Sequence, residues 1–151
     1  MISKDKKIIQ KIVLAGVVIK DGKVLILQRS QNENVYPGTW ELPSGKREPL
    51  EPSEDSLARE IKEEAGLDVK PIMPFSVFDY QIEKPEEIRD STQINFLVVL
   101  TNNNDIVLSQ EHQAFAWITI EDIEKYDITE ATKNVIKKAF ETDAIINKKF
   151  L

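Results

Sequence analysis

The apolar residues of this chain fall into short runs whose spacing predicts alternating strands and helices. Two runs, 12–19 (IVLAGVVI) and 24–29 (VLILQR), flank the dipeptide Asp21-Gly22. Asp-Gly between two apolar runs is a strong signal for a β-hairpin with a two-residue turn. The first run also resembles the apolar part of a secretory signal peptide, but no small-residue cleavage site follows it and it is too short to span a bilayer. We therefore predict a buried hairpin.

The second half of the chain continues the alternation. Residues 93–100 (QINFLVVL) are apolar on both alternating faces, as in a strand that is covered on both sides. Residues 114–120 (AFAWITI) predict another strand. Residues 130–141 have an apolar stripe at helical spacing, and Thr129 precedes them as a candidate N-cap. The pattern favours an α/β fold in which helices pack on the faces of a mixed sheet.

A turn-rich stretch separates the hairpin from the first predicted helix. It runs to Ser53 and is longer than most connections, which is typical of a functional or disordered loop. Its tryptophan, leucine and prolines favour an ordered loop. The helix is expected from Ser53 to Ala65, with Pro52 and Ser53 as start signals and Gly66 as the stop.

Composition narrows the class of protein. The 151 residues, 41% hydrophobic and 30% charged, contain no repeat or linker and predict a single globular domain over 1–151. A formal net charge of −6 argues against binding to nucleic-acid backbones. The absence of cysteine excludes disulfides and thiolate metal sites, which fits a cytoplasmic location. We expect a small-molecule partner rather than a nucleic acid or a membrane, and the sequence leaves a homodimer open.

The helix at 53–65 carries an unusual set of acids. Its apolar stripe is formed by Leu57, Ile61 and Ala65. Glu60 and Glu64 flank this stripe four residues apart, at the border between core and solvent, and Glu63 lies one step further round. Like charges at this spacing repel, and more so where solvent is partly excluded. A divalent cation such as Mg²⁺, which prefers oxygen ligands, would compensate. A solvated acidic face is the alternative.

The wider window, residues 45–67 (GKREPLEPSEDSLAREIKEEAGL), carries a longer pattern. It resembles the Nudix box of the MutT/Nudix hydrolase family, G-x5-E-x7-R-E-U-x-E-E-x-G-U, where U is a bulky aliphatic residue. Every specified position is filled, by Gly45, Glu51, Arg59, Glu60, Ile61, Glu63, Glu64, Gly66 and Leu67. The resemblance implies an α/β/α sandwich that hydrolyses a nucleoside diphosphate linked to another group.

The resemblance also implies a metal site that holds Mg²⁺ or Mn²⁺. By position, Glu60 and Glu64 would be the main ligands, and Glu63 would be a ligand or a near neighbour. The carbonyl of Ser44, which precedes the box glycine, would be another ligand. A second glycine is common in the family at this position, so the serine is a departure that bears on the local backbone conformation.

The remaining box residues are implied to support the catalytic glutamates. Arg59 would orient one of them, and Glu51 would support the loop or a water on the metal. Gly45 belongs to the loop scaffold, and Gly66 with Leu67 would end the helix. For Glu51 and Gly66 a purely structural role is an equally good interpretation.

Two candidates lie outside the box. Glu111 precedes Trp117 by six residues, an interval that MutT-like members use for a further metal ligand or general base. Arg29 ends the second hairpin strand, where a guanidinium can hold a phosphate. His112 is interpreted as an ordinary surface histidine without a role.

The substrate is less well defined than the metal site. Trp40 and Trp117 fit a core, and Phe78 and Tyr80 either line a base pocket or pack within a strand. The leading hypothesis is hydrolysis of a nucleoside triphosphate, oxidised or noncanonical ones included, to a monophosphate and pyrophosphate. Hydrolysis of ADP-ribose or a nucleotide sugar is the alternative hypothesis, although the proline that the ADP-ribose subgroup of the family tends to have about sixteen residues after the box is replaced here by Glu83. The third hypothesis is a non-catalytic domain that senses nucleotides.

Overall fold

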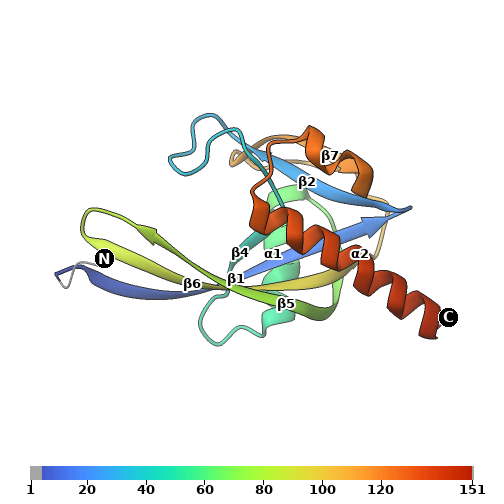
Figure 1. The fold of residues 1–151 in the computed structure, drawn as a ribbon, viewed down its shortest axis with the longest axis horizontal. Coiled ribbons are helices and arrows are strands. Elements are labelled where there is room, and N and C mark those ends of the chain that lie inside the picture. Colours follow the sequence, from blue (N-terminus) through green and yellow to red (C-terminus); the bar gives the residue numbers. More distant parts are fainter. Residues whose placement is uncertain (1–4, 151) are drawn as a thin grey trace.

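A computed structural model describes residues 5–150 of the chain as one mixed sheet with two helices (Figure 1). The elements in chain order are β1 (Lys7–Lys20), β2 (Lys23–Arg29), β3 (Trp40–Glu41), β4 (Ser44–Lys46), α1 (Ser53–Ala65), β5 (Val69–Glu83), β6 (Glu87–Leu100), β7 (His112–Ile118), the 3₁₀-helix η1 (Ile120–Lys125) and α2 (Glu130–Phe150). No helix within residues 5–150 is long and apolar enough to cross a membrane.

The sheet is mostly antiparallel. Its strands follow the order β3-β2-β1-β6-β5, with β4 paired to β1 and β7 paired to β2. Among the paired strands of residues 5–150, only β1 and β6 run parallel. The predicted hairpin is confirmed: Lys20 pairs with Lys23, and both Asp21 and Gly22 have the positive φ angles that a tight two-residue turn requires.

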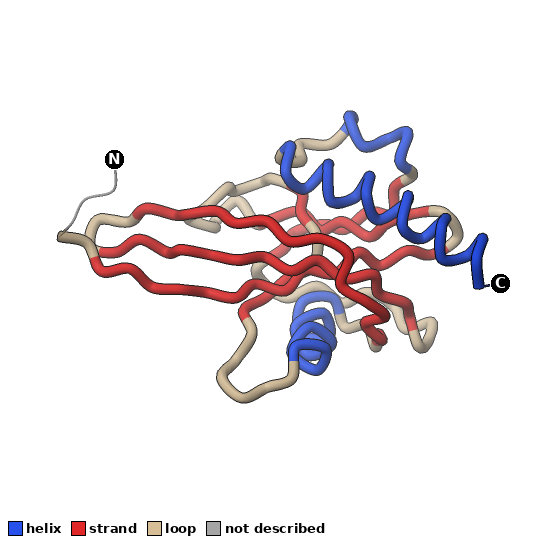
Figure 2. The backbone as a smooth tube through the Cα atoms, turned by 60° about the horizontal axis from the view of Figure 1, so that its bottom comes forward, coloured by secondary structure: helices blue, strands red, loops and turns tan. Residues whose placement is uncertain are grey.

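The two helices cover opposite faces of the sheet, which confirms the expected layering (Figure 2). Alternate residues of β1 point to different cores. Leu14 and Val18 pack with Leu57 and Ile61 of α1. Ala15 and Val17 pack with residues of α2, chiefly Val135, Ile136 and Ala139. The central part of β1 is therefore buried on both sides, which explains its unbroken apolar run.

Three strands continue beyond the two cores as a projecting ribbon (Figure 1). We call this ribbon the arm; it consists of residues 7–12 of β1, 79–83 of β5 and 87–92 of β6. Across the arm, Lys11 pairs with Ser91, and Ser91 pairs with Tyr80, so these three side chains share one face.

Several predicted boundaries were wrong, for reasons visible in the sheet. β1 and β6 begin earlier than expected, at Lys7 and Glu87, because the arm mixes charged and apolar residues and leaves no clean period. A strand at Phe78 and Tyr80 was one of two interpretations, but the full extent of β5 was not predicted, since its prolines coincide with breaks in the register. β3 and β4 interrupt the turn-rich stretch. β7 spans 112–118 rather than 114–120, and α2 continues to Phe150.

Candidate active site

The helix α1 sets the position of the acidic residues. It begins after Pro52 and ends at Gly66, whose φ of 71° and N–H bond to the Lys62 carbonyl form a left-handed C-cap. This matches the predicted span. Leu57 and Ile61 are fully buried on the sheet. The same rotation that buries them brings Glu64 almost fully inside, with 6% of its surface exposed.

Glu64 lies at the centre of a group of four carboxylates, which we call the acidic cluster: Glu41, Glu60, Glu64 and Glu111. Burial raises the pKa of Glu64 well above its usual range, and the charges of Glu41, Glu111 and Glu60 raise it further. Among the described residues, the hydrogen-bond donor to its carboxylate is the backbone N–H of Ser44, at 3.2 Å from Oε2, rather than a cationic side chain.

Glu60 occupies space that only a glycine in β4 leaves free. A Cβ added to Gly45 would lie 2.1 Å from Cδ of Glu60, so the box glycine lets this carboxylate rest against the β4 backbone. Burial raises the pKa of Glu60, Arg59 opposes that shift, and Glu63 and Glu111 add to it. Position 45 therefore favours glycine, because the Glu60 carboxylate lies too close to leave room for a Cβ atom.

Arg59 holds three glutamates together. Its guanidinium contacts Glu51 at 3.0 Å, Glu60 at 3.1 Å and Glu63 at 3.1 Å. These partners raise the pKa of Arg59, with Glu51 the largest cause, and the Arg59 hydrogen bond lowers the pKa of Glu51. The carboxylate of Glu63 points to Arg59, and 57% of its side chain is exposed. Glu63 is thus a neighbour of the acidic cluster rather than part of it.

The loop before β7 brings Glu111 to the same place. Val107 N–H donates to the Ala65 carbonyl and Ser109 N–H donates to the Glu64 carbonyl, so this loop closes over the end of α1. The Glu111 carbonyl then accepts from Ser30 N–H at 2.8 Å. Glu111 is exposed and acts electrostatically on both Glu60 and Glu64. The spacing to Trp117 did identify a residue next to the box helix.

Glu41 is a member of the cluster that the sequence interpretation missed. It accepts a 2.8 Å hydrogen bond from His112 Nε2 and two longer contacts from Arg29, at 3.3 and 3.4 Å. The interpretation of His112 as a surface residue was wrong, because its side chain is 1% exposed. The segment WELPS, which directly precedes the box, was the available signal.

Arg29 lies beside the site but is already engaged. Besides Glu41, its guanidinium donates to the carbonyl of Val35 at 2.8 Å and contacts Glu33 at 3.5 Å. These bonds tie the loop between β2 and β3 to the sheet. For Arg29 to bind a phosphate, its contact with Glu33 or with Glu41 would have to break.

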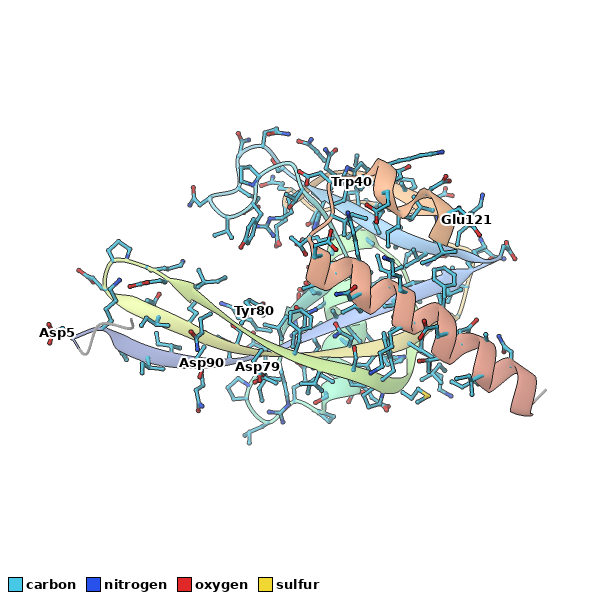
Figure 3. The ribbon with its side chains drawn as sticks, in the orientation of Figure 1. Asp5, Trp40, Asp79, Tyr80, Asp90 and Glu121 are labelled. Atoms are coloured by element: carbon cyan, nitrogen blue, oxygen red, sulfur yellow. The ribbon has the colours of Figure 1, made fainter. Side chains whose placement is uncertain are left out.

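A pocket of about 440 Å³ opens next to Ser44 and Glu41. We call it the aromatic pocket; Trp40, Phe78, Tyr80 and Gln93 are among its lining residues. Its floor is the face of β5 and β6 on which Phe78 pairs with Gln93, and Tyr80 lies on the opposite side of this ribbon from Asp79 and Asp90 (Figure 3). The start of α2 contributes Thr129, Ala131 and Thr132 to its wall.

The same sheet face carries cations from three neighbouring strands. Lys46 of β4 pairs with Val13, Lys11 lies two residues along β1, and Arg89 of β6 pairs with Ile9. Burial and the nearby charges of Lys11, Arg89 and Lys84 lower the pKa of Lys46. Arg89 lines the aromatic pocket, and its buried Nε forms no hydrogen bond among the described residues but lies 3.6 Å from the carboxylate of Glu87. In a chain of net charge −6, this concentration of cations favours a local anionic ligand.

The donor set of the acidic cluster fits a hard divalent cation. Among the described residues, no three His, Cys, Asp or Glu side chains are already drawn together as a metal-ion site. The buried, unpaired carboxylate of Glu64 and the other acids of the cluster nevertheless offer oxygen atoms whose mutual repulsion a cation would remove. Ser44 lies next to these acids, since its backbone N–H donates to the Glu64 carboxylate.

A complete box, an acid-rich helix and a mixed sheet between two helices define a Nudix fold, and sequence comparison agrees. The NUDIX domain family model matches residues 11–139, so the chain belongs to this family and is a Nudix hydrolase. A protein named nucleoside triphosphatase NudI from Klebsiella pneumoniae is 30% identical over 130 residues, covering 82% of this chain and 92% of the relative. A Salmonella arizonae protein of the same name is 31% identical over 138 residues, covering 85% and 95%.

Solved structures have the same fold. A MutT NUDIX hydrolase from Burkholderia pseudomallei superposes with a TM-score of 0.72 at 24% identity, covering 85% of this chain and 97% of that one. An ADP-ribose pyrophosphatase from Streptococcus suis gives a TM-score of 0.69 at 19% identity, covering 88% and 91%. At these identities the likeness establishes the fold, and the expected Nudix-type α/β architecture is confirmed.

Proposed function

We propose that this Nudix hydrolase cleaves a nucleoside triphosphate to a nucleoside monophosphate and pyrophosphate. The observation that carries the proposal is the acidic cluster around buried Glu64, directly beside a pocket with aromatic and cationic walls. Such a site can hold the polyphosphate at the acids and the nucleoside against the aromatic rings. The relatives named nucleoside triphosphatase support the choice of substrate.

In this proposal Glu60, Glu64, Glu111 and the Ser44 carbonyl hold Mg²⁺, or Mn²⁺ in its place, with Glu63 close by. The cation would neutralise polyphosphate charge and make a water molecule more acidic. Arg59 fixes Glu60 and Glu63 through its three ion pairs, so the carboxylates need little reorganisation when substrate arrives. Gly45, Glu51 and Gly66 keep this arrangement in place.

We assign Glu111 as the general base. It is the exposed member of the cluster, whereas Glu64 is buried, so its carboxylate is open to solvent. Positioned there, it can accept a proton from the water that attacks phosphorus. Glu64 then serves mainly as a ligand.

The cations on the sheet face would contact the phosphate chain or its leaving group. Arg89 and Lys46 are the nearest candidates, since Arg89 lines the pocket and Lys46 follows the box glycine directly. Arg29 remains a predicted phosphate ligand that would exchange its bond to Glu33 or Glu41 for one to substrate.

The proposal is tested by a substrate panel with product identification. Nucleoside triphosphates, ADP-ribose and nucleotide sugars are incubated with enzyme and Mg²⁺, and the products are separated. We expect the triphosphates to turn over fastest and to give monophosphate and pyrophosphate. Diphosphate and orthophosphate as primary products, or faster cleavage of ADP-ribose, would contradict it. The single domain over 1–151, the cytoplasmic location and the homodimer left open by the sequence stay predictions.

A further inference from the structure

A buried polar chain lies under the aromatic pocket and has no part in the chemistry of the acidic cluster. Asn95, in the middle of β6, is 0% exposed. Its Nδ2 donates to Ser76 Oγ at 3.0 Å, and its Oδ1 accepts from Gln93 Nε2 at 2.8 Å. A buried amide is costly in a sheet core unless its partners are supplied, so these three residues act as one unit.

This chain of hydrogen bonds ends at the pocket. Gln93 is one of the lining residues, and one N–H of its amide is occupied by Asn95. This hydrogen bond restricts the rotation of the Gln93 amide and leaves its Oε1 as an acceptor. A side chain fixed in advance loses little conformational entropy when it binds a ligand.

Aromatic rings flank this amide. Phe78 lies directly opposite Gln93 in the β5–β6 register, and the Phe78 and Tyr80 rings are 5.7 Å apart. The two rings are tilted by 35° to each other. Aromatic faces next to one polar amide are a setting that suits a nucleobase, whose face packs on a ring while its edge forms hydrogen bonds.

We propose that Gln93 determines base specificity by accepting, through Oε1, a hydrogen bond from an N–H at the edge of a nucleobase that lies against Phe78 and Tyr80. Asn95 and Ser76 are positioning residues that fix the Gln93 amide. The inference rests on the proposed function in one respect, since it assigns the aromatic pocket to the nucleoside end of the substrate.

The test compares base selectivity in three proteins. The spread of kcat/KM across ATP, GTP, CTP and UTP is measured for the unchanged enzyme, for Gln93→Leu, and for Gln10→Leu as a control on the other face of the arm. We expect Gln93→Leu to reduce the spread about tenfold or more, mostly by loss on the best base, because a site built to bond a base loses its discrimination with that bond. Gln10→Leu should leave the spread unchanged. An equal loss on every base would overturn the proposal.

The positioning residues give a second test. Ser76→Ala removes the acceptor of Asn95 and should narrow the spread in part, while Ser76→Thr keeps a hydroxyl and should restore it. A lower rate with an unchanged spread in Ser76→Ala would show that the chain of hydrogen bonds is only structural.

Binding separates this inference from the proposed function. Calorimetric titration with AMP, GMP, CMP and UMP needs no turnover. If the unchanged protein discriminates among these ligands and Gln93→Leu does not, the inference holds even where triphosphates are not cleaved. If triphosphates are cleaved but Gln93→Leu discriminates as before, the inference alone fails.

Discussion

Glu64 is the residue on which the site depends most, because it is a carboxylate held inside the protein without a cation beside it in the described chain. We expect Glu64→Gln to lower kcat by several orders of magnitude at saturating Mg²⁺. Thermal stability should not fall, since Glu and Gln have similar helix propensities and a neutral amide avoids the cost of burying a charge.

Steady-state kinetics and thermal melts of the purified variant check this. Glu54→Gln is the matched control, because Glu54 lies in the same helix but is exposed. Similar activity losses in the two variants would show that position on the helix does not matter.

A substitution of Glu111 tests whether this residue, and not Glu64, acts as the general base of the acidic cluster. If it takes the proton of the attacking water, Glu111→Gln should lower kcat by about 10²–10⁴-fold. Its substrate affinity should change less. Glu121→Gln, at another exposed acid, should change kcat by less than about twofold. A near-normal rate for Glu111→Gln from about pH 6 to about pH 9 would remove Glu111 from the chemistry.

Which residues could be predicted depended on whether their signal was local. Glu60 and Glu64 were found from helix spacing and the box pattern, both of which are written within one segment. The bond between Glu41 and His112 joins positions 71 residues apart, and although Glu41 lies just before the box and His112 follows Glu111, nothing local shows that the two side chains meet. Such a contact exists only once β3 and β7 both lie against β2.

At the scale of elements, the contact between β4 and α1 makes a separate prediction. Gly45→Ala would place a methyl group where the Glu60 carboxylate now rests, so that carboxylate must move. The end of a flexible side chain can move without unfolding the domain. We expect the apparent Mg²⁺ affinity and kcat to fall while the circular-dichroism spectrum is unchanged. Gly22→Ala, in the hairpin turn and with no atom near its added Cβ, should leave the Mg²⁺ dependence unaltered.

The end of α1 is tied to the loop between β6 and β7 by Asp68. Lys62 lies 3.0 Å from one of its oxygens, and Asn104 donates to the other at 3.1 Å. The hydrogen bond from Lys62, followed by one from Asn102, lowers the pKa of Asp68 below its usual 3.8. The stabilisation that follows from this shift is complete above 3.8 and is lost as the pH falls through the lower folded-state pKa.

Asp68→Asn should therefore lower the melting temperature at neutral pH by a small amount, since the pair is exposed. The difference from the unchanged protein should shrink as the pH drops below 3.8. Thermal melts from about pH 7 to about pH 3 check this. A difference that persists or grows in acid would assign the effect to lost packing instead of lost charge.

Element boundaries were predictable where turn chemistry was explicit. Asp21-Gly22 and Gly66 marked the hairpin and the helix end because each has a positive φ that few other residues adopt readily. The arm was hard to predict because charged and apolar residues mix along its strands, although Ile88 and Ser91 are buried there. The extent of β5 was hidden for another reason: its prolines at 71 and 74 fall at irregularities in the register.

At the scale of the whole molecule, the fold separates two environments that the proposed reaction needs. The acids gather where α1, β4 and the loop before β7 meet. The aromatic and cationic residues lie on the face of the sheet on which α2 packs, from β4 outward along the arm, and they meet the acids at Glu41 and Ser44. A substrate whose phosphates reach the acids and whose base reaches Phe78 and Tyr80 spans both, which is how an acidic protein can accommodate a polyanion.

The most direct test of this account is the initial rate of nucleoside triphosphate hydrolysis in excess chelator, followed by back-titration with Mg²⁺. The acidic cluster cannot engage a polyphosphate without a cation, so the account predicts no turnover in chelator and a saturable recovery as free Mg²⁺ rises. Undiminished hydrolysis in excess chelator would contradict it.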